Sequence, residues 1–225
     1  MLTDAVLRDP GMLLLIFGML SLAPFILIMT TAFVKLSAVL SILRSALGTS
    51  QIPPNTVITG LSVILSILIM LPVVDDIHEN MKASGMNVQT NQGNTDLKVS
   101  LENLYACAEE PLRGFLRLHT HPEEEEMLRR LIGGYRTAGE SAGNDSDIIL
   151  VTAFVLSELK EAFQIGFLVF LPFIIIDMIV ANILQAMGMV MLSPTTISLP
   201  FKLLLFVLSD GWHLLIEGLV AGYFI

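Results

Sequence analysis

The chain has 225 residues, of which 54% are hydrophobic and only 15% charged, against about a quarter charged in ordinary soluble domains. Its formal net charge is −9, and residues 75–161 hold 16 acidic but only 8 basic residues. Because no basic patch is available to neutralise phosphates, we expect no nucleic-acid partner. The apolar excess instead indicates a membrane protein or a subunit buried in an assembly.

Residues 1–74 are predicted to form an N-terminal hydrophobic helical hairpin. Residues 11–34 carry no charge, and about 20 such residues are enough to span a bilayer. Pro24 is expected to kink this helix or divide it in two. The helical pattern continues to Gly48 and resumes in the uncharged residues 57–74. We expect no cleavable signal peptide, because the first residues lack a basic region.

Residues 75–147 differ in character and are predicted to form an acidic, mostly helical middle segment. A polar stretch near residues 84–100 has few large apolar side chains, which is typical of a mobile loop. A helix interrupted at Pro111 is expected next. A second short helix from Glu123 to about Tyr135 has an acidic first turn, which the helix dipole favours.

Residues 148–225 are predicted to form a second hydrophobic hairpin. Its first helix runs into the apolar residues 162–176, an uncharged run that Asp177 interrupts before residues 178–201, which are again free of charge. A methionine-rich loop ends at Pro194, which breaks the chain. Ser198 is expected to cap a last helix that runs almost to the final residue. The predicted fold class is all-α, with two hydrophobic hairpins around a smaller helical segment.

Among the charged residues in or beside the apolar helices, the informative ones are Lys35, Arg44, Asp177, Lys202 and Asp210. A charge at the bilayer centre costs at least about 2.5–3.5 kcal/mol, so these side chains are expected to face protein or water. One interpretation is that they snorkel from the ends of ordinary spans. The other is that they form ion pairs between helices or between subunits of an assembly.

The sequence does not predict catalysis, and we expect neither an enzyme nor a cofactor site. His119 and His121 stand beside four glutamates, but no third ligand has metal-binding spacing. Gly133 and Gly134 lack the lysine and strand of a phosphate-binding loop. Cys107 is the only cysteine, so it forms no disulfide within the chain, and it is predicted to be a small core residue.

Three stretches carry a family resemblance. The stretch ILIMTTAFVKLSAVLSILRSALGTSQIPPNTVITGLSVILSILIM resembles the first hairpin of the FliP/SctR family, and EPLRGFLRL resembles its middle helix. AFVLSELKEAFQIGFLVFLPFIIIDMIVANILQAMGMVMLSPTTISLPFKLLLFVLSDGW resembles the C-terminal half of the family, and this long motif is specific. Within the family, AFVKLSAVL is closer to injectisome members than to flagellar ones.

The resemblance implies a core subunit of the type III secretion export gate in the bacterial inner membrane, multi-pass by hydropathy. Family members form a homo-pentamer with copies of a small two-helix export subunit and one third pore-forming subunit, in a helical hetero-oligomeric ring. A switch protein wraps the cytoplasmic side, and a large export-gate protein lies below. Unfolded secretion substrates pass through the centre. Much of the assembled complex lies on the periplasmic side of the inner membrane lipids.

The resemblance also implies a gasket role for the methionine-rich loop, at the narrowest point of the channel. Gly188 and Pro194 are predicted to be the hinges that let the loop project. Many relatives have methionine at all three matching positions, so Val190 is a departure. From spacing alone, ordinary core packing is the competing interpretation. The predicted gasket residues are Met187, Met189, Val190 and Met191.

An alternative function is a four-span ion or small-molecule transporter that would use Asp177 and Lys202 as a midplane site. The sequence shows no related halves, which are a usual mark of secondary transporters. A further hypothesis, compatible with the export gate, is that the five charged residues are assembly ion pairs rather than residues of a transport pathway.

Overall fold

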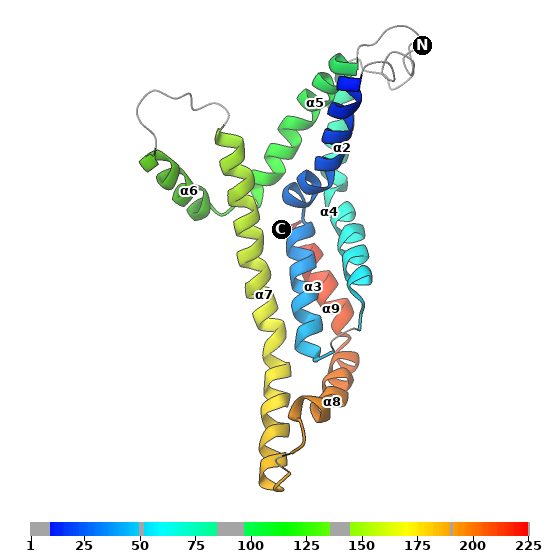
Figure 1. Cartoon of the computed structure of the whole chain (residues 1–225), viewed down its shortest axis with the longest axis vertical. Helices are drawn as coiled ribbons and strands as arrows, with labels where there is room; N and C mark the ends of the chain where they lie inside the picture. Colours follow the sequence, from blue (N-terminus) through cyan, green and yellow to red (C-terminus); the bar gives the residue numbers. More distant parts are fainter. Residues whose placement is uncertain (1–9, 50–51, 85–96, 136–144, 190, 225) are drawn as a thin grey trace. The chain divides into compact units, whose positions relative to one another are not determined.

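The computed structural model describes residues 10–49, 52–84, 97–135, 145–189 and 191–224 (Figure 1). These residues form eight helices and no strand, which confirms the all-α fold class. The helices are α2 (Pro10–Thr30), α3 (Phe33–Leu47), α4 (Asn55–Ala83), α5 (Leu97–Leu118), α6 (Pro122–Tyr135), α7 (Asp145–Ala186), α8 (Pro194–Leu208) and α9 (Gly211–Ala221).

The chain divides into two compact units, which we describe separately. Unit 1 comprises Met1–Thr31 and Met70–Val155, and unit 2 comprises Ala32–Ile69 and Leu156–Ile225. The helices α4 and α7 each contribute one end to each unit. The division into an N-terminal hairpin, a middle segment and a C-terminal hairpin (residues 1–74, 75–147 and 148–225) stays a prediction.

In unit 1, α2 runs through Pro24 and is not divided there. It ends at Thr30, whose hydroxyl donates to the Ile26 carbonyl at 2.8 Å, while the Thr31 hydroxyl donates to the Leu27 carbonyl at 2.7 Å. Such bonds from threonine to the fourth preceding carbonyl weaken and bend helices. The threonine pair, rather than the proline, therefore ends the helix.

The helix α5 passes through Pro111, so the predicted interruption there is wrong. Proline has no N–H group, which leaves the Cys107 carbonyl without its donor inside the helix. The Asn80 side chain of α4 donates to this carbonyl at 3.3 Å. Cys107 itself is buried, as predicted, and its sulfur lies 3.7 Å from Ser84 Oγ. A tertiary hydrogen bond thus lets the helix tolerate proline.

The predicted short helix of the middle segment is confirmed as α6. Its first turn holds three glutamates, and Glu125 pairs with Arg129 one turn later at 2.5 Å. Within the predicted loop at 84–100, residues 85–96 lie outside the described residues. The helix α5 already begins at Leu97, so the loop ends earlier than expected.

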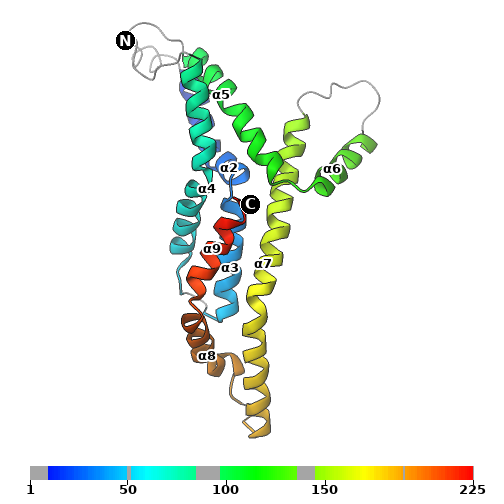
Figure 2. The same ribbon diagram turned by 180° about the vertical axis from the view of Figure 1, so that it is seen from behind.

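In unit 2, α3 is the most buried helix. Leu36, Val39 and Leu43 recur at helical spacing and are 0–2% exposed. Gly48 ends the helix in the left-handed conformation with φ 76°, as its position predicted. The helix α9 runs beside α3, as the views from both sides show (Figures 1 and 2).

The helix α7 is continuous for 42 residues and passes through Asp177, which interrupts the uncharged run but not the helix. At about 1.5 Å per residue it is about 63 Å long, twice the roughly 30 Å of a bilayer core. Among the described residues, two helices are long and apolar enough to cross a membrane: Asn55–Ala83 and Ser146–Ala186. The number of spans rises to as many as four if each of two bent helix pairs forms one span. Part of α7 therefore has to lie outside the hydrocarbon region.

The last helix differs from the prediction in two ways. It begins at Pro194, so Ser198 lies inside α8 and does not cap it. It also breaks at Ser209 and Asp210, where α8 and α9 are bent by 61°. Asp210 has a φ of 50°, which no residue in a right-handed helix adopts. A Cβ atom on Gly211 would approach the Phe206 ring to 2.4 Å, so the bend needs glycine there.

Candidate functional site

The methionine-rich loop joins α7 to α8 over residues 187–193. Gly188 has a φ of 74°, and its N–H donates to the Gln185 carbonyl at 3.0 Å. The Met189 N–H donates to the Leu184 carbonyl at 2.9 Å. These two bonds form a complete Schellman motif, which satisfies the carbonyls at the helix end and requires a left-handed residue. The chain therefore leaves α7 in a defined direction.

The methionine side chains of this loop point away from the protein. Met187 is 62% exposed, Met189 is 44% exposed and Met191 is fully exposed. Pro194 begins α8 directly after the loop, while the predicted gasket position Val190 lies outside the described residues. Because none of the three methionines is buried, packing in the core does not explain them.

Lys202 of α8 lies in a cluster that joins the two helices flanking this loop. Its ammonium donates to Asp177 Oδ2 at 2.6 Å and to the Ala46 carbonyl at 3.0 Å. The Ser198 hydroxyl donates to the other carboxylate oxygen of Asp177. We call Lys202, Asp177, Ser198 and the Ala46 carbonyl the Lys202 cluster. It joins α7 and α8 to the last turn of α3, where a cation is favoured by the helix dipole.

Lys35 of α3 lies in a second cluster. Its ammonium is 3.3 Å from Glu158 Oε1 and 2.7 Å from Glu161 Oε2, and it stands 3.9 Å above the centre of the Tyr223 ring. The Tyr223 hydroxyl donates to Glu158 Oε2. We call these four residues the Lys35 cluster. Burial, followed by the nearby Glu158 carboxylate, raises the pKa of Tyr223, so the phenol stays protonated and acts as the donor.

The other two predicted charges are placed differently. Arg44 donates to the Asn55 side chain and enters no ion pair among the described residues. Asp210 lies at the bend between α8 and α9, and it too has no cationic partner among the described residues. Lys35, Asp177 and Lys202 thus pair within one chain, and pairing between subunits stays a prediction.

Sequence reasoning missed Glu158, Glu161 and Tyr223. The two glutamates are three residues apart in a helix that continues into an apolar run, and this spacing places both carboxylates on one helix face. That pattern indicates a cation on a neighbouring helix. Tyr223 has no comparable local signal.

His119 and His121 lie in the link between α5 and α6. His119 packs against Phe115 with ring centres 4.6 Å apart. Within the described ranges, no group of three or more His, Cys, Asp or Glu side chains is placed to hold a metal ion.

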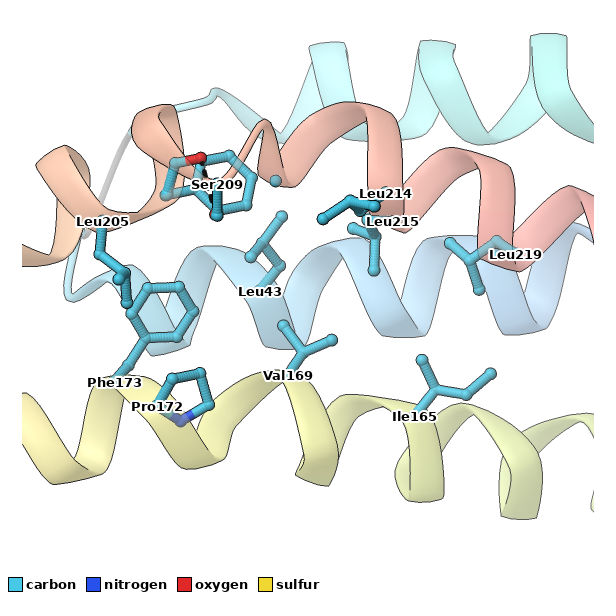
Figure 3. Close-up of a pocket in the computed structure, with 13 residues that line it drawn as sticks. Leu43, Ile165, Val169, Pro172, Phe173, Leu205, Ser209, Leu214, Leu215 and Leu219 are labelled. Carbon is cyan, nitrogen blue, oxygen red and sulfur yellow. Dashed lines mark hydrogen bonds between the residues drawn. The ribbon is translucent and has the colours of Figure 1, made fainter.

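An apolar groove of about 440 Å³ runs between α7, α8 and α9 in unit 2. Figure 3 shows Leu43 of α3 between Val169 of α7 and Leu214 and Leu215 of α9. The one polar side chain that lines it is Ser209, whose hydroxyl already donates to a backbone carbonyl. The groove therefore offers no group that would recognise a polar substrate.

Residues 16–219 match the FliP family. The chain belongs to the FliP family. It is 43% identical over 221 residues to Yop proteins translocation protein R of Yersinia pestis, which covers 96% of this chain and 98% of the relative. It is 42% identical over 211 residues to flagellar biosynthetic protein FliP of Bacillus subtilis (strain 168), covering 94% and 90%. Harpin secretion protein HrcR of Erwinia amylovora is 38% identical, with 96% and 97% covered.

These matches extend over nearly the whole chain, so membership is not limited to one motif. The FliP-family chain is a component of a type III secretion or flagellar export apparatus, associated with the inner membrane. The family is a structural part of that apparatus, and its members work with other export components. The resemblance read from the three sequence stretches is confirmed.

Proposed function

We propose that this chain is a structural pore subunit of a type III secretion export gate and that its methionine-rich loop seals the gate at rest. The observation that carries the proposal is the exposure of Met187, Met189 and Met191 on a loop that leaves α7 through a Schellman motif. A contiguous group of exposed apolar side chains, such as these together with Leu192, is typical of a contact with a partner. Here the partners are the same loops of neighbouring subunits.

The chemistry of methionine suits a seal of this kind. An export gate has to pass unfolded chains of any sequence but hold back ions when it is closed. Methionine is apolar, unbranched and flexible, so several copies can fill an irregular gap and rearrange around cargo. A narrow ring of apolar side chains also excludes water, which blocks ions. We assign the seal to Met189 and Met191, with Met187 and Val190 beside them.

The test is the double substitution Met189→Ala and Met191→Ala in the assembled complex. We expect higher ion conductance in a planar bilayer, because the shortened side chains leave a hydrated gap. The complex should still assemble, since neither side chain is buried in the chain. Unchanged conductance with normal assembly would contradict the seal.

A matched control removes two exposed methionines outside the loop, with Met29→Ala and Met178→Ala. These side chains are 42% and 60% exposed, which is comparable to Met189 at 44% but less than Met191. The control complex is expected to keep the conductance of the wild type. A leak from the control as large as that from the loop variant would show that methionine content, and not the loop, sets conductance.

We also propose the assembly that the family resemblance implies. The chain forms a homo-pentamer with a small two-helix subunit and a third pore-forming subunit, and a switch protein and a large export-gate protein contact its cytoplasmic side. The large exposed apolar surface of α7 supports this proposal, since only 17% of the apolar stretch within Ser146–Ala186 is buried in the chain. Native mass spectrometry of the complex purified through this chain would give five copies and name the partners.

The position and branch of the complex complete the proposal. Much of the assembly lies on the periplasmic side, as the family resemblance implies. The length of α7, about twice the bilayer core, supports a complex that extends beyond the membrane without selecting the side. We place the chain in the injectisome branch on the stretch AFVKLSAVL. Identities of 43% and 42% to injectisome and flagellar relatives favour neither branch. The subunits that copurify, injectisome or flagellar, decide this point.

A transporter function is not supported by a specific observation. Such a function would use Asp177 and Lys202 as an open midplane site. Both Asp177 oxygens instead accept hydrogen bonds, one from Lys202 and one from Ser198. A carboxylate already occupied in this way does not offer a vacant ion site.

A further inference from the structure

We propose that the Lys202 cluster is a clamp that positions the methionine-rich loop, so that Lys202, Asp177 and Ser198 are positioning residues of the gate. The inference rests on the proposed function, because it assigns a role to residues that do not reach the pore. It differs from a general role in folding, because it predicts a change in the closed gate without loss of assembly.

The loop itself contains little that could fix its position. Its described residues hydrogen-bond only to one another and to the adjoining ends of α7 and α8. Its methionines and Leu192 are exposed. The place of the loop is therefore set by the relative positions of the two helices that carry it, and any contact that fixes these helices fixes the loop.

The Lys202 cluster is such a contact. Asp177 precedes Met187 by ten residues on α7, and Lys202 follows Met191 by eleven residues on α8. Ten helical residues correspond to about 15 Å. The ion pair thus ties the two helices together at the open end of the hairpin that carries the loop, where a small rotation moves its tip furthest.

The cluster also fixes the hairpin to a third element. Lys202 donates to the Ala46 carbonyl in the last turn of α3 and lies against Gly48, whose added Cβ atom would stand 3.8 Å from Nζ. One ammonium therefore has directional bonds to α7 and to α3 at the same time. Hydrogen bonds of this kind define an angle and a register, which apolar contacts do not.

The Lys202 cluster is a second polar tie between α3 and α7. The Lys35 cluster already joins the same two helices at Glu158 and Glu161. Asp177 stands 19 residues beyond Glu158, or about 28 Å along α7. The Lys202 cluster lies nearer the loop than the Lys35 cluster does, on the part of α7 that carries the loop.

The first variant is Lys202→Met, which keeps the length of the side chain and removes its charge and donors. We expect the complex to assemble and its resting conductance to rise about tenfold, equivalent to about 1.4 kcal/mol in the ratio of closed to open gates. Lys202→Arg, which retains the charge, is expected to leak less than Lys202→Met. Glu217→Gln removes one charge of an exposed pair on α9 and is the control expected to behave as the wild type.

A second variant separates positioning from burial of an unpaired charge. The double substitution Asp177→Leu and Lys202→Met removes both charges, and such replacements restore stability in other proteins. If the cluster is a clamp, this complex assembles at wild-type yield and still leaks, because apolar contacts do not fix the angle between α7 and α8. Wild-type conductance in this double variant would overturn the inference.

A direct readout of loop position uses Met191→Cys in a Cys107→Ala background, which leaves one cysteine per copy. We expect a disulfide between neighbouring copies in the closed gate and its loss when Lys202→Met is added. Crosslinking at the same yield in both complexes would also overturn the clamp.

The conductance measurements separate a failure of the clamp from a failure of the proposed function. If Met189→Ala and Met191→Ala raise conductance but the clamp variants do not, the clamp is wrong and the proposed seal is retained. If neither does, the proposed function fails.

Discussion

Lys35 and Lys202 are both buried lysines in apolar helices, but their surroundings differ. Lys35 faces two carboxylates and an aromatic ring, and its own side chain and that of Glu158 are 3% and 1% exposed. Lys202 faces one carboxylate and one backbone carbonyl, and the side chain of its partner Asp177 is 29% exposed. The Lys35 cluster thus holds one fully enclosed carboxylate, Glu158, beside Glu161, which is 32% exposed, whereas the only carboxylate of the Lys202 cluster lies at the solvent edge.

This difference shows that a lysine in a hydrophobic helix can have either of two roles, in folding or in positioning. An ion that is fully enclosed has no alternative partner when its neighbour is removed, so its loss is expensive. A carboxylate at the edge can be solvated instead. The Lys35 cluster is therefore expected to control whether unit 2 folds, and the Lys202 cluster to control where its helix ends lie.

The largest expected effect is that of Lys35→Met. The change leaves Glu158 buried without its cation, and breaking a buried pair in this way costs about 3–5 kcal/mol. We expect the assembled complex to be almost absent from membranes at normal growth temperature. Native gels of detergent extracts measure the yield of the complex. The comparison variant is Lys202→Met, for which we expect a smaller loss of yield. Equal yields from the two variants would remove the distinction between the clusters.

Local features of the fold were predictable from sequence. Gly48 and Gly188 both adopt the left-handed conformation at helix ends, because glycine has no Cβ atom to oppose it. The acidic first turn of α6 also follows from sequence alone. In each case the deciding interaction lies within one turn of the residue.

Features that depend on distant partners were not predictable. Lys35 meets Glu158 and Glu161, which are 123 and 126 residues away. Ser198 was predicted as a helix cap from its neighbours, but its hydroxyl binds Asp177 of another helix. Pro111 was expected to interrupt a helix, but the Asn80 side chain of α4 donates to the carbonyl that the proline leaves without a donor. Local pattern shows that a charged or hydroxyl side chain needs a partner, but not which one.

Tyr223→Phe removes one hydroxyl from the Lys35 cluster and keeps the ring beneath the ammonium. Glu158 Oε2 then loses its donor inside the protein, and an unsatisfied buried group costs about 1–3 kcal/mol. We expect a lower temperature of complex dissociation, with a smaller loss than for Lys35→Met. Tyr105→Phe is the matched control, because Tyr105 is 63% exposed. A complex as stable as the control would mean that this hydroxyl does not support the cluster.

The smallest effect tests whether the two clusters act independently. Gly166 lies on α7 between Glu161 and Asp177, and a Cβ atom there would meet Ile42 Cδ1 of α3 at 2.4 Å. Gly166→Ala therefore forces α3 and α7 to repack, and overpacking costs about 1–3 kcal/mol. Because the tip of an isoleucine can rotate, we expect the lower end of that range in the thermal stability of the complex.

Two further variants make this last prediction decisive. Gly60→Ala adds a methyl group where no atom lies within 4 Å, so it should stabilise helix α4 by about 0.5–1 kcal/mol. Adding Ile42→Val to Gly166→Ala removes the closest clashing atom and should recover part of the lost stability. Conductance should stay at the wild-type level throughout, because Lys202 still holds α8 to α3 and α7. A leak from Gly166→Ala would show instead that the spacing of α3 and α7 sets the loop, and that the two clusters work as one.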